Sequence, residues 1–460
     1  MKNIFFLGIG GIGMSALARY YKHEGYYVAG YDRTPSALTH ELEKEGIVVT
    51  CSDNIGDLRL VIGDFAVSDT LVVRTPAVPE DQPLYTYFRE NNYTILKRAE
   101  VLGMITRQKK ALCVAGTHGK TTTSTMLAHL MNVQGDKGQG TKGVNAFLGG
   151  ISNNYHTNLL LDKNSEYVVV EADEYDRSFH HLTPYMTAIT SIDPDHLDIY
   201  GSAEAYQEGF DVYAGLVQNT IILKHGYHLK PTAAKVYTYG VEQGDFHATN
   251  IRVGNGTIIY DLVTPQGIIP DMEPGVPVWV NIENSIAAVA LAWLNGVQVN
   301  DLRQRLKTYK GVYRRFDIHV KNDKVVCIDD YAHHPTELQA SIDSVKRIYP
   351  ERKLIVAFQP HLYTRTRDFM DGFASVLSQA DELLLLPIYP AREKPIEGIT
   401  SDALAKKINK AVEVVQKKDL AKVLRDKVQS TKEPVVVMTL GAGDIDRLVE
   451  DIKLSLTTND

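Results

Sequence analysis

The sequence predicts a multidomain α/β protein in which parallel sheets are covered by helices. Apolar runs of strand length alternate with amphipathic helical segments along the chain, a pattern typical of βαβ units. Glycine-rich and polar motifs follow several of these runs directly, where ligand sites lie in parallel sheets. Because 460 residues exceed what one hydrophobic core usually organises, we expect roughly three domains.

The first domain opens with a βαβ unit. An apolar strand over residues 4–7 leads into the glycine turn GIGGIG, and a second strand ends at Asp32. The intervening helix carries an apolar face made of Met14, Leu17, Ala18 and Tyr21. The turn fits G-x-G-x-x-G through Gly8, Gly10 and Gly13, which indicates a bound nucleotide diphosphate, with Asp32 near a ribose.

The second domain contains the most informative motif of the chain, GTHGKTTT at residues 116–123. It follows an apolar strand at residues 111–115 and opens a helix, so backbone N–H groups and the helix dipole point at one place. Lys120 is expected to reach the outer phosphates of a nucleotide, and the Thr121 hydroxyl to ligate Mg²⁺. Val114 stands where the longer consensus has its first glycine, so the signal is the shortened form GTxGKT.

Acidic residues follow the next buried strand, predicted at residues 167–170. Their carboxylates are Glu171, Asp173, Glu174 and Asp176, and without compensation they would repel one another and raise their pKa values. A cation would relieve this repulsion, and Glu171 is the best placed to coordinate a metal beside Thr121; a solvated acidic loop is the alternative. His196, in DPDHLD after another apolar run, is a candidate metal ligand or proton carrier.

The third domain begins after GVYRRFD. Strands are predicted at residues 325–328, 354–358 and 435–440, and the turn DDYAHHPTE precedes a helix. Arg314 and Arg315 lie at the joint of the second and third domains, where a guanidinium can stabilise a transferred phosphoryl group. After the strand at 354–358, a bidentate fork for a carboxylate is offered by the side chains of His361, Arg365 and Arg367.

Overall composition excludes several classes of protein. A net charge of -7 without a basic block argues against nucleic-acid partners, and no segment has the length of a membrane span. The N-terminus lacks the pattern of a secretory signal, so we expect a cytoplasmic protein. The cysteines Cys51, Cys113 and Cys327 have neither metal-ligand nor disulfide spacing and are interpreted as reduced. The glycine-rich segment 135–143 is interpreted as a mobile loop near the phosphate site.

The motifs together resemble the Mur ligase family of peptidoglycan synthesis, and within it the alanine-adding branch. The resemblance spans nearly the whole chain and rests on GIGGIGMS, AGTHGKTTT, EADEYDRSF, DHLDIYG, NIENSIAA, YRRFD, DDYAHHPTE, FQPHLYTRTRD and LGAGDID. It implies a Rossmann-like UDP-sugar domain over residues 1–106, a P-loop ATPase-like domain over 107–312 and a Rossmann-like domain over 313–460 that accepts the amino acid.

The resemblance also implies a reaction. ATP phosphorylates the lactyl carboxylate of UDP-N-acetylmuramate, and the amine of L-alanine then displaces phosphate from the acyl phosphate. ATP and Mg²⁺ are the implied cofactors, and UDP-N-acetylmuramate and L-alanine are the implied partners. No nucleic acid or membrane is expected to bind, and the expected oligomeric state is a monomer or weak homodimer.

Site residues are carried over by position. The resemblance implies catalytic roles for Lys120, Glu171, His196 and Arg315; ATP contacts for Gly116, Thr117, His118, Gly119, Lys120, Thr121, Thr122, Asn281, Asn284, Arg315 and Asp330; metal ligation by Thr121, Glu171 and His196; UDP-sugar contacts for Gly8, Gly10, Gly11, Ile12, Gly13 and Asp32; and amino-acid contacts for His361 and Arg365.

Two positions differ from the family pattern. Several related Mur ligases carry a carbamylated lysine after the central histidine motif, whereas residues 197–223 contain no lysine. A second magnesium would therefore depend on Glu171, His196, phosphate oxygens and water. Leu362 stands where alanine-adding members tend to have arginine.

Three alternative functions remain open. The nearest is the recycling ligase that attaches a murein tripeptide to the same UDP-sugar, although GIGGIGMS and the pair HHPTE and TRTRD favour the alanine-adding branch. An NAD(P)-dependent dehydrogenase would account for the N-terminal βαβ unit but leaves GTHGKTTT unexplained. The third is a non-catalytic nucleotide-binding regulator.

Overall fold

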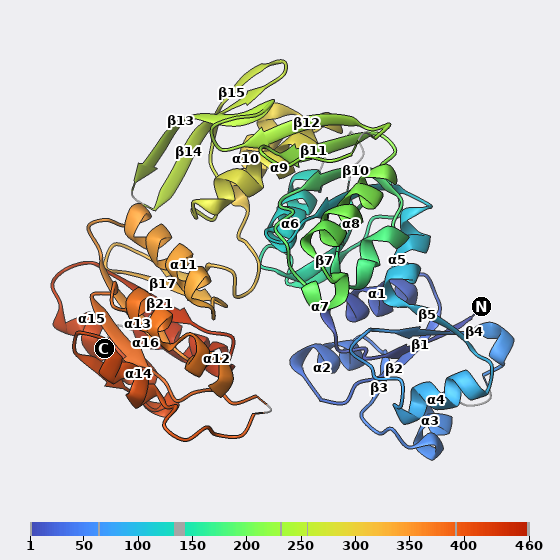
Figure 1. Cartoon of the computed structure of the whole chain (residues 1–460), viewed down its shortest axis with the longest axis horizontal. Helices are drawn as coiled ribbons and strands as arrows, with labels where there is room; N and C mark the ends of the chain where they lie inside the picture. Colours follow the sequence, from blue (N-terminus) through green and yellow to red (C-terminus); the bar gives the residue numbers. More distant parts are fainter. Residues whose placement is uncertain are drawn as a thin grey trace. The chain divides into compact units, whose positions relative to one another are not determined.

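The computed structural model describes residues 2–62, 65–132, 143–230, 232–254, 256–391 and 393–457. Within these ranges the strands form three sheets of five, ten and six strands, with helices packed on them (Figure 1). The predicted α/β class is confirmed. Most of the loop predicted at residues 135–143 lies outside the described residues.

The first sheet has the order β3-β2-β1-β4-β5, and its strands pair in parallel. Its strands are β1 (Asn3–Leu7), β2 (Tyr27–Tyr31), β3 (Val48–Thr50), β4 (Thr70–Arg74) and β5 (Thr94–Lys97). Its helices are α1 (Ile12–His23), α2 (Ala37–Lys44), α3 (Ile55–Ile62), α4 (Pro83–Glu90) and α5 (Arg98–Thr106). Because β2 follows on one side of β1 and β4 later takes the other side, the glycine turn after β1 lies at a topological switch point.

Strand β1 is buried on both faces because its side chains alternate between two cores. Phe5 and Leu7 lie in one core with apolar residues of α3 and α4. Ile4 and Phe6 lie in the other with Met14 and the rest of the apolar face of α1. The predicted amphipathic helix is therefore confirmed, and its buried face holds the glycine turn on the sheet.

The second sheet has the order β15-β14-β13-β12-β11-β10-β6-β9-β7-β8. Its strands are β6 (Lys110–Ala115), β7 (Asn145–Ser152), β8 (Thr157–Leu160), β9 (Tyr167–Ala172), β10 (Pro184–Ile189), β11 (Thr220–Lys224), β12 (Lys235–Gly240), β13 (Phe246–Gly254), β14 (Thr257–Thr264) and β15 (Gly267–Met272). Its helices are α6 (Lys120–Met131), α7 (Leu197–Tyr200), α8 (Ala203–Gly215), α9 (Val280–Leu294) and α10 (Val299–Thr308). Strand β6 pairs in parallel with β9 and β10, so their carboxyl ends share one edge.

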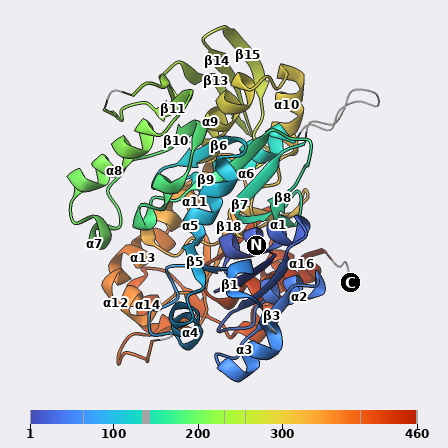
Figure 2. The ribbon, with the colours of Figure 1, turned by 90° about the vertical axis from the view of Figure 1, so that its right-hand side faces the viewer.

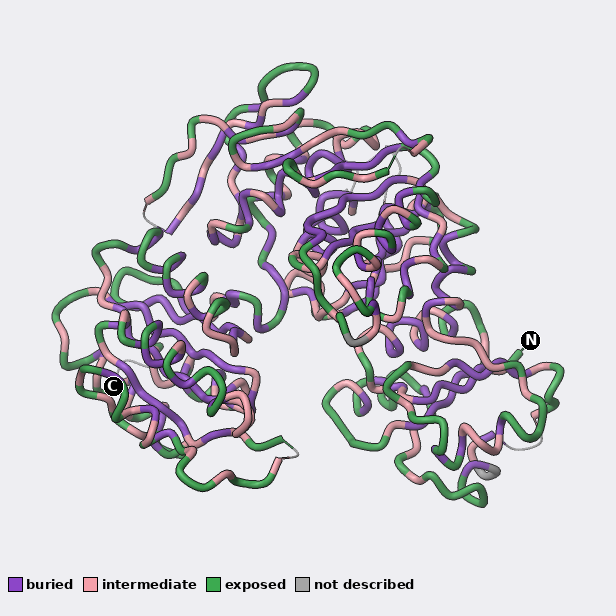
Figure 3. Tube along the Cα trace, viewed as in Figure 1, coloured by how far each residue is buried: buried purple, intermediate pink, exposed green. Residues whose placement is uncertain are grey.

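The third sheet has the order β16-β17-β21-β18-β19-β20. Its strands are β16 (Asp317–Lys321), β17 (Val325–Asp330), β18 (Lys353–Phe358), β19 (Glu382–Leu385), β20 (Val412–Val414) and β21 (Val435–Leu440). Its helices are α11 (Pro335–Ile348), α12 (Tyr363–Asp368), α13 (Met370–Leu377), α14 (Ser401–Lys407), α15 (Leu420–Ser430) and α16 (Val449–Thr457). The adjacent strands β17 and β21 are buried along their whole length, as Figure 3 shows.

The expectation of parallel sheets does not hold for every strand pair of the described residues. Strand β7 pairs antiparallel with β8, and β16 pairs antiparallel with β17. The connections between these strands are short, at residues 153–156 and 322–324. A connection of this length can only join antiparallel neighbours, because a parallel return needs a crossover of a dozen or more residues.

By its contacts the chain divides into two compact units. The first comprises residues 1–249, 262–269 and 283–306, and the second comprises residues 250–261, 270–282 and 307–460. The strands of the first two sheets up to residue 249 all lie in the first unit. Within it, α1 packs against β7 and β8 of the second sheet as well as on its own sheet (Figure 2). Among the described residues, no helix combines the length and apolarity needed to cross a bilayer.

The packing of α1 on the second sheet is fixed by Asn158, a fully buried residue of β8. Its Nδ2 donates to the Ile12 carbonyl oxygen at 2.6 Å and to Ser15 Oγ at 2.9 Å. Its Oδ1 accepts from Arg19 Nη1 at 2.6 Å. One amide side chain therefore satisfies three groups of the helix that the glycine turn opens.

We expect Asn158→Ala to lower the free energy of unfolding by about 1–3 kcal/mol, because buried polar groups of α1 lose their partner. Denaturant unfolding monitored by circular dichroism measures the change, and Asn164→Ala, at an exposed turn, is the matched control. An equal midpoint for the two variants would show that the amide is replaceable by water.

Candidate active site at the strand ends

The phosphate loop has a backbone that only glycine accommodates. Gly116 has φ +131°, and a Cβ there would lie 2.2 Å from Thr190 Oγ1. Gly119 has φ +80°, and a Cβ there would lie 2.8 Å from Asn284 Oδ1. Helix α6 begins at the next residue, Lys120, so the free N–H groups of its first turn open beside this loop.

Side-chain contacts hold the loop against the segment that follows β10. Thr117 Oγ1 donates to the Asp193 carbonyl oxygen at 2.7 Å, and the His118 N–H donates to Ser191 Oγ at 2.9 Å. Thr122 lies in the first turn of α6. These contacts fix the predicted ATP-binding loop without a ligand.

Lys120 rests on the loop itself and on a buried carboxylate. Its Nζ donates to the Gly116 carbonyl oxygen at 2.7 Å and lies 2.7 Å from Glu174 Oε2. The Glu174 side chain is only 2% exposed, so an unpaired charge there would be costly. Glu174 was one of four acidic neighbours in the sequence, and nothing in that pattern singled it out.

Three of the four carboxylates after β9 are compensated by basic side chains. Asp173 pairs with Arg98 at 3.0 Å, Asp176 with Lys97 at 2.8 Å, and Glu174 with Lys120. Lys97 and Arg98 stand at the junction of β5 and α5, about 75 residues earlier, so local sequence could not reveal these pairs. The consecutive basic residues Lys97 and Arg98 were the only signal that the sequence offered.

Of these four carboxylates, Glu171 is the one that has no salt bridge among the described residues. Its Oε2 accepts a hydrogen bond from Thr121 Oγ1 at 2.9 Å. Burial raises the pKa of Glu171, while nearby Lys120 and the Thr121 hydroxyl oppose that rise. Glu171 and Ala172 are the last residues of β9, so the carboxylate is held by the strand rather than by the loop after it.

This pair of oxygens fits a magnesium ion. A hydroxyl and a carboxylate are the hard oxygen ligands that Mg²⁺ prefers, and it usually takes only one or two carboxylates from the protein. The described residues contain no cluster of three or more His, Cys, Asp or Glu side chains that could hold a metal. Nucleotide oxygens and water would have to complete the coordination shell.

His196 lies beside Glu174. Its Nε2 is 3.9 Å from Glu174 Oε1, and its ring packs edge-on against Tyr175. It precedes α7 with φ 51°, a left-handed conformation that is uncommon outside glycine and concentrates at functional sites. The structure thus groups Thr121 with Glu171, and Lys120 and His196 with Glu174.

On the first sheet, the glycine turn after β1 is closed by Asp32. Asp32 Oδ2 accepts from the Gly10 N–H at 2.8 Å, and Gly8 has φ +86°. A Cβ at Gly13 would lie 2.8 Å from Arg98 Nη1, so a guanidinium lies over the first turn of α1. Gly11 and Ile12 are the N-cap and first residue of that helix. Arg98 therefore lies between the turn and Asp173, and the sequence analysis missed it.

The two adjacent arginines after Tyr313 have different environments. Arg314 is buried, donates to the carbonyl oxygens of Gly441 and Gly443, and lies 3.3 Å from Asp329. Arg315 is exposed and has its guanidinium over the Tyr331 ring at 5.6 Å. Arg314 is therefore structural, and Arg315 is the one available for a ligand.

Three further predicted ATP residues are buried. Asn281 and Asn284 lie in α9, Asn281 donating to the Val276 carbonyl oxygen and Asn284 packing against Gly119. Asp330 ends β17 and accepts hydrogen bonds from the Ser341 hydroxyl and the Ala332 N–H.

His361 and Arg365 form a compact pair after β18. Arg365 Nη1 lies 3.3 Å from His361 Nδ1, and the His361 ring stacks on Tyr389. Arg367 points elsewhere, since it is exposed and pairs with Asp368 at 2.7 Å. Leu362 caps α12 with φ 70° and donates its N–H to the Tyr389 carbonyl oxygen, so its role here is in the backbone turn.

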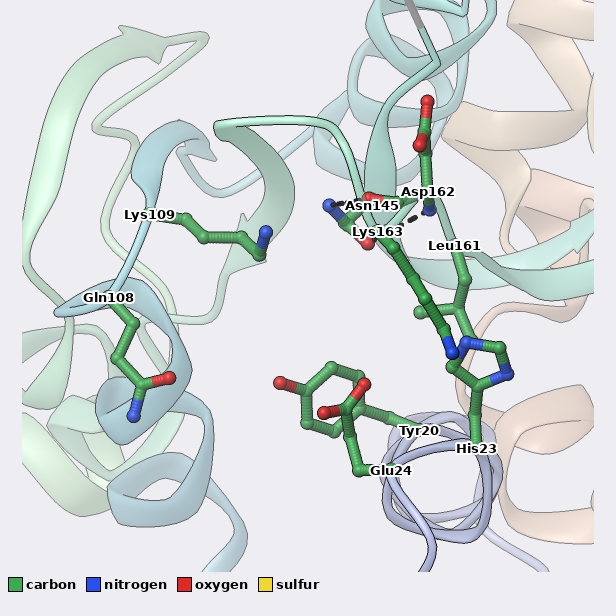
Figure 4. Close-up of a pocket in the computed structure, with 9 residues that line it drawn as sticks. All are labelled: Tyr20, His23, Glu24, Gln108, Lys109, Asn145, Leu161, Asp162 and Lys163. Carbon is green, nitrogen blue, oxygen red and sulfur yellow. Dashed lines mark hydrogen bonds between the residues drawn. The ribbon is translucent and has the colours of Figure 1, made fainter.

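A separate cavity of about 440 Å³ lies at the far end of α1 from the glycine turn (Figure 4). It is lined by Tyr20, His23, Glu24, Gln108, Lys109, Asn145, Leu161, Asp162 and Lys163. It contains none of the predicted site residues, so the strand ends, and not this cavity, carry the candidate chemistry.

Family models match most of the chain. Residues 3–110 match the model of the Mur ligase family catalytic domain, residues 114–292 the Mur ligase middle domain, and residues 314–443 the glutamate ligase domain of Mur ligases. These three segments correspond to the three sheets.

Full-length relatives agree with these matches. The UDP-N-acetylmuramate--L-alanine ligase of Parabacteroides distasonis is 54% identical over 98% of this chain and 96% of its own, and that of Phocaeicola vulgatus is 51% identical over 98% and 97%. The crystal structure of a UDP-N-acetylmuramate-alanine ligase from Thermotoga maritima superposes with a TM-score of 0.78 at 28% identity, covering 98% of both chains.

The buried carboxyl group of Asp330 makes the stability of the protein depend on pH. Burial raises its pKa to about 6, against the opposing hydrogen bonds from Ser341 and Ala332. The folded state thus binds this proton more tightly than the unfolded state. The resulting stabilisation is present below the unfolded pKa of about 4 and is lost as pH rises through about 6.

We therefore expect Asp330→Asn to gain stability relative to the unmodified protein as pH rises from about 4 to about 7. Thermal unfolding midpoints of both proteins across this range measure the difference, with Asp402→Asn on an exposed helix turn as the control. A difference independent of pH would mean that Asp330 ionises freely.

Proposed function

The chain belongs to the Mur ligase family, and on that premise we propose that it joins L-alanine to the lactyl carboxylate of UDP-N-acetylmuramate. It is an ATP-dependent amide-bond-forming ligase of peptidoglycan synthesis, and its products are UDP-N-acetylmuramoyl-L-alanine, ADP and phosphate. The single observation that carries this function is the phosphate loop with Lys120 beside the Thr121–Glu171 pair, in a chain that matches alanine-adding relatives from end to end.

The reaction requires activation of a carboxylate. A carboxylate oxygen is a poor leaving group, so an amine cannot displace it directly. Transfer of the γ-phosphoryl group of ATP to that oxygen gives an acyl phosphate, from which inorganic phosphate leaves when the amine attacks. The acyl phosphate must be kept from water until then.

ATP is proposed to bind at the carboxyl ends of β6 and β9. The loop residues Gly116, Thr117, His118, Gly119, Lys120, Thr121 and Thr122 would hold its phosphates, Asn281 and Asn284 would lie near its adenine, Arg315 would meet the γ-phosphate and Asp330 its ribose. Lys120 would then exchange its contact with the Gly116 carbonyl for phosphate oxygens, while Glu174 keeps its ammonium group in place.

Magnesium is proposed at two neighbouring sites, the first at the Thr121 hydroxyl beside Glu171 and the second held by Glu171 and His196. When bound it would neutralise phosphate charge during phosphoryl transfer. The support is the Thr121–Glu171 hydrogen bond and the absence of a salt bridge to Glu171 among the described residues. Glu174 orients both Lys120 and His196, which keeps these two groups next to the phosphate loop.

The three domains are proposed to divide the substrates as residues 1–106 for the UDP-sugar, 107–312 for ATP and 313–460 for the amino acid. The turn containing Gly8, Gly10, Gly11, Ile12 and Gly13 would bind the UDP pyrophosphate, and Asp32 would shape that turn through its hydrogen bond to Gly10. His361 and Arg365 would bind the carboxylate of L-alanine. We place the reaction in the cytoplasm, in a monomer or weak homodimer without nucleic-acid or membrane partners.

The test is phosphate release from ATP with UDP-N-acetylmuramate plus L-alanine, with the same UDP-sugar plus murein tripeptide, and with neither. Release that requires both UDP-N-acetylmuramate and L-alanine is expected. Preference for the tripeptide would assign the recycling reaction instead, and no phosphate release under any of the three conditions would favour a non-catalytic nucleotide-binding regulator or a dehydrogenase.

We expect Lys120→Ala to lose nearly all ligation while its UDP-sugar affinity stays unchanged, because Lys120 lies at the phosphate loop and the UDP-sugar is proposed on the first sheet. Coupled ADP release and calorimetry without ATP measure the two properties. Lys163→Ala, at an exposed lysine of the separate cavity, is the control. A parallel loss of sugar affinity would overturn the division of substrates between the domains.

We expect Arg365→Ala to raise the KM for L-alanine well over tenfold, because losing a charge-assisted contact at a desolvated site costs about 2–5 kcal/mol. The KM values for ATP and UDP-N-acetylmuramate should change little. Arg367→Ala is a matched control two residues away, since its guanidinium already pairs with Asp368. Equal rises for all three substrates would instead indicate a folding role for Arg365.

A further inference from the structure

His333 is held in one tautomer by its backbone surroundings. It lies between β17 and α11, and its Nδ1 is 3.0 Å from the Tyr331 carbonyl oxygen and 3.3 Å from a Glu337 carboxylate oxygen. Both partners only accept hydrogen bonds, so Nδ1 must carry the hydrogen. In the neutral ring, Nε2 then holds a lone pair, and no hydrogen bond occupies it within the described residues.

The neighbouring imidazole, His361, is held in the opposite tautomer. The rings of His333 and His361 meet edge to face with centroids 6.2 Å apart. A guanidinium can only donate, so the contact from Arg365 to His361 Nδ1 places the His361 hydrogen on Nε2. Of these two imidazoles, His333 is therefore the one whose unoccupied nitrogen can accept a proton.

The charges around His333 keep it neutral and ready to accept. Burial lowers the pKa of His333, and the guanidinium groups of Arg365 and Arg315 lower it further. Glu337 and the Tyr331 carbonyl oppose these effects. A base of this kind is useful close to neutral pH, because a protonated imidazole could take up no further proton.

We propose that His333 is the general base that removes a proton from the α-ammonium group of L-alanine. The inference rests on the proposed function, in which His361 and Arg365 bind the carboxylate of the same amino acid. The α-carbon joins that carboxylate to the ammonium group, so a base a few ångströms from the fork is within reach of the amine. Both groups belong to one compact unit, and the base therefore accompanies the amino acid.

The proton balance of the step is complete. L-Alanine arrives as an ammonium ion whose nitrogen has no lone pair, and one proton passes to His333 Nε2. The freed lone pair forms the C–N bond with the acyl phosphate carbon, and the C–O bond to phosphate breaks as inorganic phosphate leaves. The second proton lost by nitrogen passes to that phosphate or to water.

Other side chains near His333 and His361 already make hydrogen bonds within the protein. Asp330 accepts from Ser341 and Ala332, and Glu337 accepts from the backbone N–H groups of His333 and His334 as part of the cap of α11. His334 Nδ1 accepts from the Thr336 N–H and also caps α11, with its ring against Phe369.

The decisive experiment compares two nucleophiles on the full-length enzyme with ATP and UDP-N-acetylmuramate. L-Alanine needs deprotonation, whereas hydroxylamine is largely unprotonated at neutral pH and attacks an acyl phosphate to give a hydroxamate without a base. We expect His333→Gln to lower kcat with L-alanine by about 10²–10⁴-fold, the usual contribution of a general base. Hydroxamate formation should stay within about twofold of the unmodified enzyme, which also shows that the variant folds and makes the acyl phosphate.

The pH profile supplies a second readout. The alanine-dependent rate of His333→Gln should rise with pH in proportion to the free amine, whereas the unmodified rate should level off once His333 is neutral. The groups that face His333 and shape this profile are Tyr331, Glu337, His361, Arg365 and Arg315. His334→Asn is the matched control, because asparagine preserves a helix cap, and it should keep both rates and the unmodified profile.

The outcomes separate the inference from the function on which it rests. Equal losses with both nucleophiles would assign His333 to ATP binding or to structure, and equal retention would show that the base lies elsewhere; either result overturns the inference. If the unmodified enzyme makes hydroxamate but no product with L-alanine, the proposed amino-acid substrate is wrong and the inference fails with it.

Discussion

Charge pairing at the carboxyl end of β9 is the constraint on which the rest of the site depends. Four carboxylates within six residues cannot remain ionised at a partly buried strand end without partners. Three receive a cation, from Lys97, Arg98 and Lys120, whereas the fourth, Glu171, is hydrogen-bonded by the Thr121 hydroxyl and has no salt bridge in the described part of the chain. The pairing leaves one carboxylate available next to the phosphate loop, and it ties the first sheet to the second through the basic pair that begins α5.

The two compact units carry different groups of the proposed site. The first unit carries the glycine turns after β1 and β6, which are proposed to bind phosphates, and there Asn158 and Arg98 hold α1 against the second sheet. The second unit carries the groups suited to an amino acid, namely a guanidinium fork and an imidazole with a free nitrogen. Activation of the carboxylate and preparation of the amine can thus be separate events until the acyl phosphate forms.

Much of the fold was predictable because its signals are local. The apolar face predicted for the first helix is the buried face of α1. The strand predicted at residues 111–115 agrees with β6 except that β6 begins one residue earlier, and the strand at 435–440 agrees with β21. The helix that GTHGKTTT opens is α6. The antiparallel strands β8 and β16 were not predicted, because the βαβ pattern along the chain indicates parallel neighbours and these two strands depart from it. Similarly, Arg315 rather than Arg314 was assigned to the γ-phosphate only through the family resemblance, since adjacent identical residues carry no local distinction. The structure shows that Arg315 is exposed and Arg314 is buried.

The sequence by itself determined the α/β class, the two glycine turns at strand ends and the family, because these depend on glycine spacing and hydrophobic periodicity along the chain. Only the tertiary structure decided which acid pairs with which base, and which nitrogen of His333 is free. Those properties depend on atoms brought together from distant segments, such as Arg98 with Asp173 or Arg365 with His361. Burial then sets their energies, because a charge or hydrogen bond acquires its full effect only where neighbouring elements exclude water.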